Sequence, residues 1–193
     1  MRLLAFSDLH RNKRLAADLV KRSREADVVI GAGDFASIHV GLEKTIEVLS
    51  EIEKPSLLVP GNNEKEDALR KACLDWPAAT VLHGETLELD GVRFFGLGAG
   101  IPTTPWPWSF DLTDEEAEER LRDAPQGGVY VLHSPPKGHV DKGLGSEAIL
   151  RAIEAKQPEL AVCGHIHECW GDESRIGVSR VVNLGPEGRT FQI

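Results

Sequence analysis

Residues 56–64 read Ser56-Leu57-Leu58-Val59-Pro60-Gly61-Asn62-Asn63-Glu64, a short apolar run that leads into a turn rich in glycine and asparagine. Short continuous apolar runs favour strands that are buried on both faces of a sheet. Glycine and asparagine are common in turns for conformational reasons alone. The stretch therefore predicts a buried strand, and it leaves open whether the asparagines only shape the turn or also hold a ligand.

Four other apolar runs are followed within a few residues by aspartate or histidine. RLLAF precedes Ser7–His10, DVVI precedes Gly31–Asp34, VYVL precedes His133, and ELAVC precedes Gly164–His167. The runs alternate with helix-compatible segments at residues 12–25, 42–53, 64–73 and 146–156, which is typical of an α/β fold. Because ligands bind at the carboxyl ends of strands in an open α/β sheet, we expect these polar side chains to converge on one crevice.

Each of these motifs has a plain structural explanation when it is taken alone. Asp-x-His can be a helix cap, Gly-Asp a turn, and the two histidines of GHIH a solvated pair. Together, seven side chains with oxygen or nitrogen donors follow five strands, which exceeds what caps and turns explain: Asp8, His10, Asp34, Asn62, His133, His165 and His167. Such donors without thiolate suit Mn, Fe, Zn, Ni or Co. Seven donors are too many for one ion, but two ions about 3.5–4 Å apart would use them all.

The blocks DLH, GD, GNNE, HSPP and GHIHE stand in this order between Asp8 and Glu168, and the order resembles the pattern of the calcineurin-like metallophosphoesterases. The longer blocks HSPPKGHVDKGLGSEAIL and GHIHECWG are most similar to the small single-domain prokaryotic members of that family. The resemblance implies one domain over residues 1–193. It also implies a four-layer α/β/β/α sandwich, in which two facing mixed sheets are flanked by helices.

The resemblance further implies a dinuclear metal centre, with manganese as the favoured metal. By matching position, one ion would be held by Asp8, His10, Asp34 and His167. Asp34 would bridge to the second ion, which would be completed by Asn62, His133 and His165. Such a centre implies a phosphoester hydrolase in which a metal-bound hydroxide attacks phosphorus in line, so that no serine, cysteine or aspartate nucleophile is needed.

Asn63 departs from the family pattern, because many members carry a histidine there as a candidate general acid for the leaving group. An amide can donate a hydrogen bond to a phosphate oxygen but cannot deliver a proton near pH 7. Small members without this histidine resemble phosphodiesterases, so we expect a phosphodiesterase. A phosphomonoesterase or nuclease of the same family is one alternative, and a non-enzymatic interaction module on the same fold is another.

The composition argues against several classes of partner. The 193 residues carry a net charge of −9, which disfavours an extended nucleic-acid surface and binding to anionic membranes. No apolar stretch approaches the roughly 20 residues of a membrane span, and the N-terminal run is too short for a signal peptide. Cys73, Cys163 and Cys169 show no CxxC spacing and are expected to be reduced thiols of a cytoplasmic protein. The expected partner is a small phosphoester, and the oligomeric state is open.

Several residues near the motifs have two interpretations each. Glu64 either orients a neighbouring group or is an acid in the first turn of a helix. Arg11 either contacts phosphate or is solvated at the entry to a helix. His39 and His139 are expected at the surface, although both segments could rim the crevice, and His83 is expected in a loop.

Four segments outside the motifs predict a long loop, two hairpins and a further helix. The stretch Gly98–Phe110 is rich in glycine, proline and tryptophan and predicts a long loop, which either walls the substrate site or is pinned by buried Trp106 and Trp108. Hairpins are expected over residues 79–97 and 177–193, where LDGV and PEGR supply turn residues. An acidic helix over residues 113–123 is expected to begin with Thr113 or Asp114 as its N-cap.

Overall fold

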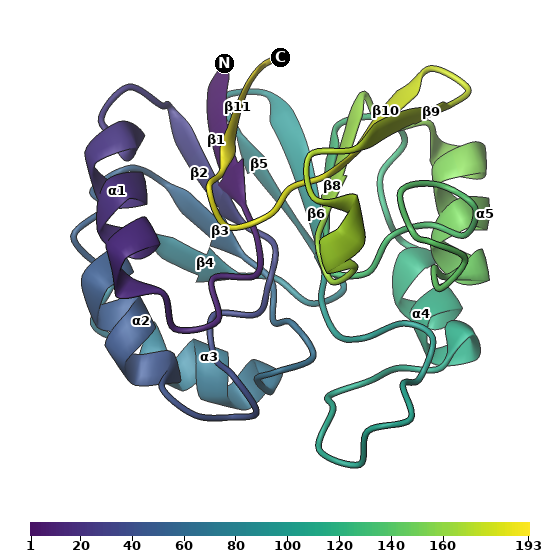
Figure 1. The fold of residues 1–193 in the computed structure, drawn as a ribbon. Coiled ribbons are helices and arrows are strands. Elements are labelled where there is room, and N and C mark those ends of the chain that lie inside the picture. The colour runs from purple at the N-terminus through teal and green to yellow at the C-terminus, as the bar shows by residue number, and fades with distance from the viewer.

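Two β-sheets face each other in the computed structural model, which describes residues 1–193 (Figure 1). The first sheet has the strand order β11 (Arg189–Gln192), β1 (Arg2–Phe6), β2 (Val28–Gly31), β3 (Ser56–Leu58) and β4 (Ala79–Val81). The second has the order β5 (Glu85–Leu89), β6 (Val92–Leu97), β7 (Val129–Leu132), β8 (Leu160–Cys163), β10 (Ser179–Asn183) and β9 (Glu173–Ile176). Both sheets are mixed, since parallel central strands are bordered by antiparallel ones.

Helices cover the outer face of each sheet (Figure 1). The first sheet is covered by α1 (Lys13–Ser23), α2 (Leu42–Leu49) and α3 (Glu66–Ala72). The second sheet is covered by α4 (Asp114–Leu121) and α5 (Glu147–Lys156), and a short 3₁₀ helix, η1 (His167–Cys169), follows β8. The predicted four-layer α/β/β/α sandwich is therefore confirmed. None of these helices combines the length and the apolar character that a membrane crossing requires.

The apolar core forms three layers, because side chains alternate between the two faces of each strand. In β1, Leu4 and Phe6 pack toward the helices, whereas Leu3 and Ala5 pack between the two sheets. In β7, Tyr130 and Leu132 likewise belong to the helix-facing layer, and the valines on either side of Tyr130 to the layer between the sheets. Burial on both faces explains why these strands are continuous apolar runs in the sequence.

Polar caps fix where several helices begin. The Asn12 side chain accepts a hydrogen bond from Leu15 N at the start of α1. Thr113, rather than Asp114, is the N-cap of α4, where it forms a capping box with Glu116. Ser146 caps α5, where its Oγ accepts a hydrogen bond from Ile149 N at 3.1 Å. The predicted helix over residues 42–53 ends earlier, at Leu49, and the one over residues 64–73 begins later, at Glu66.

The predicted C-terminal hairpin is wrong. β10 pairs with β9 across a turn at Gly177, whereas β11 crosses to the other sheet and pairs with β1. The segment around Pro186 therefore links two sheets instead of closing a hairpin. The hairpin over residues 79–97 is correct only for β5 and β6, because β4 pairs with β3 in the first sheet. In both places the strands are found by their pattern, but their partners are set by contacts distant in the sequence.

Candidate metal centre

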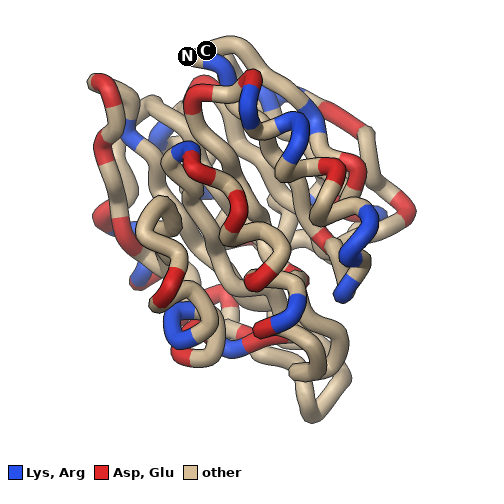
Figure 2. Tube along the Cα trace, turned by 90° about the vertical axis from the view of Figure 1, so that its left-hand side faces the viewer, with Lys and Arg blue, Asp and Glu red and all other residues tan.

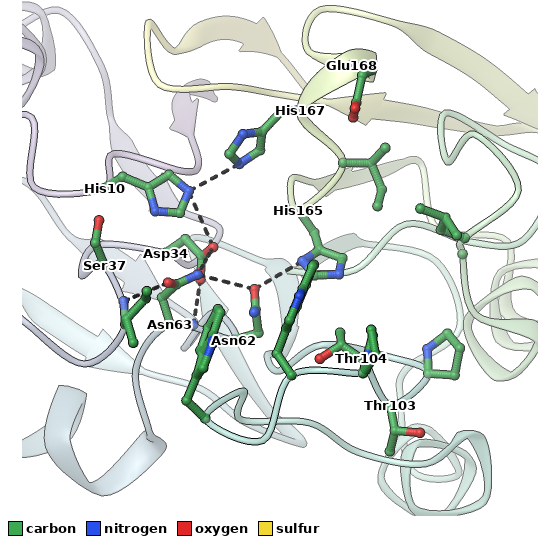
Figure 3. A pocket seen from close by; sticks show the side chains of 18 of the residues that line it. His10, Asp34, Ser37, Asn62, Asn63, Thr103, Thr104, His165, His167 and Glu168 are labelled. Atoms are coloured by element: carbon green, nitrogen blue, oxygen red, sulfur yellow. Dashed lines mark hydrogen bonds and ion pairs between the residues drawn. The ribbon is translucent and has the colours of Figure 1, made fainter.

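All seven predicted metal ligands meet where the carboxyl ends of strands from both sheets come together. Asp8 and His10 follow β1, Asp34 follows β2, and Asn62 follows β3. The second sheet contributes the remaining histidines, which come after β7 and β8: His133, His165 and His167. His10, His167, Asp34, Asn62 and His165 point toward one another in Figure 3.

Asp34 lies between two sets of these side chains. Its Oδ2 is 3.5 Å from His10 Nε2, and its Oδ1 is 3.5 Å from His133 Nε2. Asn63 holds the carboxylate in place, because its backbone N–H donates to Oδ1 at 2.9 Å and its side-chain amide donates to Oδ2 at 2.7 Å. Each oxygen of Asp34 therefore faces one imidazole, which is an arrangement suited to bridging two cations.

The first set joins the two sheets. His10 Nε2 lies 3.1 Å from His167 Nε2, and His167 Nε2 lies 3.8 Å from Asp8 Oδ1. His10 Nδ1 lies 3.2 Å from the Ala36 carbonyl and can donate its proton there. If the neutral ring carries its proton on Nδ1, the lone pair of His10 Nε2 faces His167 Nε2 and the Asp34 carboxylate. A cation between these groups would make the contact favourable. Asp8, His10 and His167 can thus converge on one ion.

The second set is centred on Asn62, the first asparagine of the GNNE block. Asn62 Oδ1 lies 3.2 Å from His133 Nε2 and 3.1 Å from His165 Nδ1. His133 Nδ1 faces the Ala32 carbonyl at 2.8 Å, so its Nε2 carries no proton in the neutral ring. An amide oxygen and a bare imidazole nitrogen thus face each other, and a cation between them would be coordinated by both. The donor set therefore fits two divalent ions of the type that nitrogen and oxygen ligands prefer.

Neighbouring polar groups orient Asn62 and Asp8. Asn62 Nδ2 donates to Ser109 Oγ at 2.9 Å, and Ser109 Oγ donates to Asp111 Oδ1 at 2.6 Å. Asp8 Oδ2 accepts hydrogen bonds from Ser7 Oγ and from Trp170 Nε1. Sequence reasoning missed Ser109, Asp111 and Trp170, because their roles depend on contacts that exist only in the folded chain.

Four of the seven predicted ligands have a strained backbone. Asp8, His10, Asp34 and His165 have positive φ values of 54°, 43°, 58° and 67°. Left-handed conformations cost non-glycine residues about 1–3 kcal/mol each and cluster at functional sites. The surrounding hydrogen bonds hold these residues in conformations that bring their side chains into one crevice.

Two glycines of the motifs are required by close packing against the carboxylates. A methyl group on Gly61 would overlap Oδ1 of Asp34, and one on Gly164 would overlap Oδ2 of Asp8. Because glycine has no side chain, the loop after β3 can approach Asp34 directly, and the loop after β8 can approach Asp8.

Glu64 orients the loops of the site and is not a helix-terminal acid. Its carboxylate accepts hydrogen bonds from Gly61 N at 2.7 Å, Asp34 N at 2.8 Å and Ala36 N at 2.9 Å. Glu64 is buried, and α3 begins only at Glu66. One side chain thus ties the turn after β3 to the loop after β2.

The pKa values reflect acids and imidazoles packed together away from water. Burial, and then repulsion from Asp8, raises the pKa of Asp34 to about 6, against the attraction of His133. Burial and the Asp34 carboxylate raise the pKa of Glu64 to about 7. Burial and the charge of His133 lower the pKa of His165 to about 3, which keeps that imidazole neutral. Added cations would stabilise the ionised carboxylates and release their protons.

The remaining predicted residues take clear positions. Asn63 is buried, and its Oδ1 accepts a hydrogen bond from Ile38 N at 2.8 Å. His39 is exposed, as predicted, and its Nε2 contacts the Trp108 carbonyl. Arg11 is exposed and packs beside Gly41, outside the residues that line the groove.

Two further histidines and the two loop tryptophans differ in how far they are buried. His139 is half-buried, and its Nδ1 lies 3.2 Å from Ser174 Oγ. His83 lies in a loop, as predicted, but it is buried. The interpretation of the Gly98–Phe110 loop as pinned by buried tryptophans is wrong, since Trp106 is 49% exposed and Trp108 is only half-buried.

A groove of about 730 Å³ opens from the metal centre onto the Gly98–Phe110 loop. Figure 3 shows its wall, where Thr103 and Thr104 lie beyond the histidines and the two asparagines. A volume of this size suits a small organic ligand. The candidate metal centre thus lies at one end of a binding groove.

Comparisons with known proteins agree with this arrangement. The chain is 27% identical to the UPF0046 protein K07C11.7 of Caenorhabditis elegans over 76% of its own length and 58% of that protein. It is 27% identical to the human metallophosphoesterase domain-containing protein 1, over 75% of its length and 55% of that protein. The chain thus spans a little over half the length of these two relatives.

Solved structures share the fold at low identity. TT1561 of Thermus thermophilus superposes with a TM-score of 0.76 at 21% identity, over 96% of this chain and 90% of that one. A dimetal phosphatase from Danio rerio superposes with a TM-score of 0.67 at 13% identity, over 96% and 88%. Residues 1–192 match the protein family described as "Calcineurin-like phosphoesterase superfamily domain". The chain therefore belongs to the calcineurin-like phosphoesterase superfamily.

Proposed function

We propose that this chain is a phosphodiesterase that uses two divalent metal ions, with manganese favoured, to hydrolyse a small phosphodiester. The observation that carries the proposal is the position of Asp34, whose two carboxylate oxygens each face a different histidine. One ion would be held by Asp8, His10, Asp34 and His167. The other would be held by Asp34, Asn62, His133 and His165.

The chain's own residues hold the predicted ligands in place. When bound, two such ions neutralise phosphate oxygens and lower the pKa of water to near neutrality. Asn63 and Glu64 fix the carboxylate and the backbone of Asp34. Ser7, which directly precedes the predicted ligand Asp8, is buried and donates its hydroxyl to that carboxylate, so it is not available to attack a substrate.

A diester is favoured over a monoester because the position of a general acid is taken by an amide. Asn63 Nδ2 donates to the Asp34 carboxylate, and the amide has no proton that it could give to a leaving group near pH 7. General-acid help is typically worth about 10²–10⁴-fold in rate, most of all for poor leaving groups. Without it, activity is expected to be highest on diesters and aryl esters with good leaving groups.

The test is hydrolysis of bis-p-nitrophenyl phosphate with added Mn²⁺. Asp34→Asn keeps the shape of the side chain but removes the charge between the two sets of ligands, so kcat/KM should fall by more than about 100-fold. Asp18→Asn, which removes an exposed charge on α1, is the matched control and should retain activity. Equal activity in the two variants would overturn the assignment of Asp34.

The alternatives give different outcomes in the same assay. A monoesterase would cleave p-nitrophenyl phosphate faster than the diester, and a nuclease would degrade single-stranded DNA or RNA. Acidic and basic residues are interspersed along the chain in Figure 2, without a continuous basic stripe of the kind that binds nucleic acid. No hydrolysis with any divalent metal would favour an interaction module.

We also propose that the protein works in the cytoplasm. Cys73, Cys163 and Cys169 are all free and buried. Burial raises the pKa of Cys73 to about 12 and that of Cys163 well above its usual value, so neither thiol is reactive. Cell fractionation with an antibody against the protein would test the location, and recovery from an exported fraction would contradict it.

A further inference from the structure

The groove beside the metal centre has an aromatic wall. Trp106 and Trp108 stack with their rings 5.7 Å apart and only 9° from parallel, and both line the groove. Trp106 is 49% exposed. The loop that carries them has no charged residue between Gly98 and Phe110, and it forms the uncharged projection at the bottom of Figure 2. Contiguous exposed apolar surface, as opposed to a single exposed side chain, is typical of ligand-binding grooves.

The wall is held in place before any ligand binds. Asp111 Oδ2 accepts hydrogen bonds from Thr104 N at 2.7 Å and Thr104 Oγ1 at 2.8 Å. His39 Nε2 contacts the Trp108 carbonyl, and Phe110 N donates to the Asn62 carbonyl at 2.9 Å. The loop is therefore anchored to a predicted metal ligand at its base. Such preorganisation reduces the entropy that binding would otherwise cost.

Apolar side chains other than the tryptophans also line the groove. Ile38 is 55% exposed and Leu144 is 63% exposed, and both line the same groove. Lys137 lines it as well, on the segment before α5. The groove thus combines predicted metal ligands with exposed apolar side chains. A substrate that matches both carries an apolar group close to its phosphate.

We propose that the groove binds a flat aromatic substituent of the phosphodiester, such as an aryl group or a nucleobase, against the Trp106–Trp108 pair. The inference rests on the proposed function for the phosphate end of the ligand. An aromatic group is favoured over an alkyl chain because parallel indoles present a flat surface. Stacking of a base on an aromatic side chain is worth about 1–3 kcal/mol by alanine substitution.

The first test keeps the leaving group constant and varies the other ester. Methyl, cyclohexyl and 2-naphthyl p-nitrophenyl phosphates all release p-nitrophenolate, so differences in kcat/KM report binding of the second substituent. The wild-type protein should prefer the naphthyl ester over the methyl ester by about tenfold or more. Trp106→Ala should lower this ratio by about tenfold, and Trp106→Leu should lower the ratio of naphthyl to cyclohexyl ester.

Two outcomes would overturn the inference. Equal kcat/KM for the naphthyl and methyl esters would show that the wall does not bind the substituent. Equal values for the naphthyl and cyclohexyl esters would show that it has no preference for flat groups. Leu74→Ala removes an exposed apolar side chain outside the groove and should leave both ratios unchanged.

A binding measurement separates this inference from the proposed function. 2-Naphthylphosphonate and methylphosphonate cannot be hydrolysed as esters, and their affinity for the Mn²⁺-loaded protein can be measured by calorimetry. Tighter binding of the naphthyl compound, lost in Trp106→Ala, would support the aromatic site even if no diester were cleaved. Diester cleavage together with equal affinity for the two phosphonates would leave the phosphodiesterase in place and overturn the aromatic site.

Discussion

The amide of Asn63 is shared between the metal centre and the loop that precedes α2. Its Nδ2 donates to Asp34 at 2.7 Å, and its Oδ1 accepts from Ile38 N at 2.8 Å. Both hydrogen bonds depend on the amide having one donor and one acceptor end. Asn63 therefore helps to position Asp34, and as an amide it cannot act as a general acid.

Asn63→His should raise kcat most for diesters with poor leaving groups. The imidazolium could protonate a departing alkoxide, a contribution of about 10²–10⁴-fold at most. Hydrolysis of a series of alkyl and para-substituted aryl phosphodiesters with Mn²⁺ would measure the gain in kcat as a function of the pKa of the leaving group. Asn63→Gln keeps an amide and should give no such dependence. An equal gain for good and poor leaving groups would contradict this role.

His83 makes the fold sensitive to acid at a distance from the metal ligands. It is buried, its Nδ1 accepts a hydrogen bond from Gly98 N at 3.2 Å, and its Nε2 has no partner. Burial, and then the nearby charge of Arg120, lowers the pKa of His83 to about 4. Between pH 6.5 and 4 the unfolded chain therefore takes up a proton that the folded chain does not.

Stability should consequently fall as the pH is lowered through this window. From pH 7 to 4.5 the His83 contribution to the free energy of unfolding should decrease by about 2–3 kcal/mol. His83→Gln retains an acceptor for Gly98 N but does not titrate, so the variant should lose less stability over the same range. Urea denaturation of both metal-free proteins would measure the difference. An identical pH dependence would show that His83 is not responsible.

At the scale of secondary-structure elements, Asp114 connects the two helices that cover the second sheet. It lies in the first turn of α4, yet its Oδ1 accepts hydrogen bonds from Ser146 Oγ and from Ala148 N at the start of α5. Asp114 and Ser146 thus satisfy the N–H groups of Ala148 and Ile149 at the start of α5, which have no partner within the helix.

Asp114→Ala should destabilise the protein by about 1–2 kcal/mol, because the N-cap of α5 loses its partner. Glu115→Ala is the matched control, since it removes an exposed acid from the same turn of α4 without touching α5. Urea denaturation near pH 7 would measure both variants. Equal effects would mean that only the charge in the first turn of α4 matters, and that the link between the helices contributes nothing.

Local patterns predicted most elements but not all of their partners. The caps Asn12, Thr113 and Ser146 have chemical signatures in the sequence, and each is found at its helix start. The apolar pattern predicts strands at β10 and β11, but the turn residues between them also predict a hairpin that does not form. Turn propensity is local, whereas the choice between two sheets depends on packing across the whole molecule.

At the scale of the whole molecule, the position of the site follows from the topology. Parallel strands of both sheets end at the same side, so residues more than 100 positions apart, such as Asn62 and His165, come within 3.1 Å. This convergence could be predicted because each ligand directly follows an apolar run. The contacts of Trp170 and Ser109 could not, since neither follows a strand and both depend on how the loops fold back.

Metal binding should stabilise the entire fold, because the predicted ligands come from both sheets. Asp8, His10 and Asn62 belong to the first sheet, and His133 and His165 to the second, so bound ions would link the two halves. A ligand present at about 100 times its Kd stabilises the native state by about 3 kcal/mol. For a chain of this length, that corresponds to a rise in Tm of about 6–12 °C.

The measurement is thermal unfolding in EDTA and in excess Mn²⁺. Asp34→Asn should lose most of the rise in Tm, since Asp34 faces both sets of ligands. Asp18→Asn, on the exposed face of α1, should keep it. Lowering the pH from about 7.5 to about 5.5 should also reduce the rise, because Asp34 and Glu64, whose pKa values are raised to about 6 and 7, then retain protons that the ions must displace. An equal rise in wild type and Asp34→Asn would place the bound metal elsewhere and would contradict a centre that joins the two sheets.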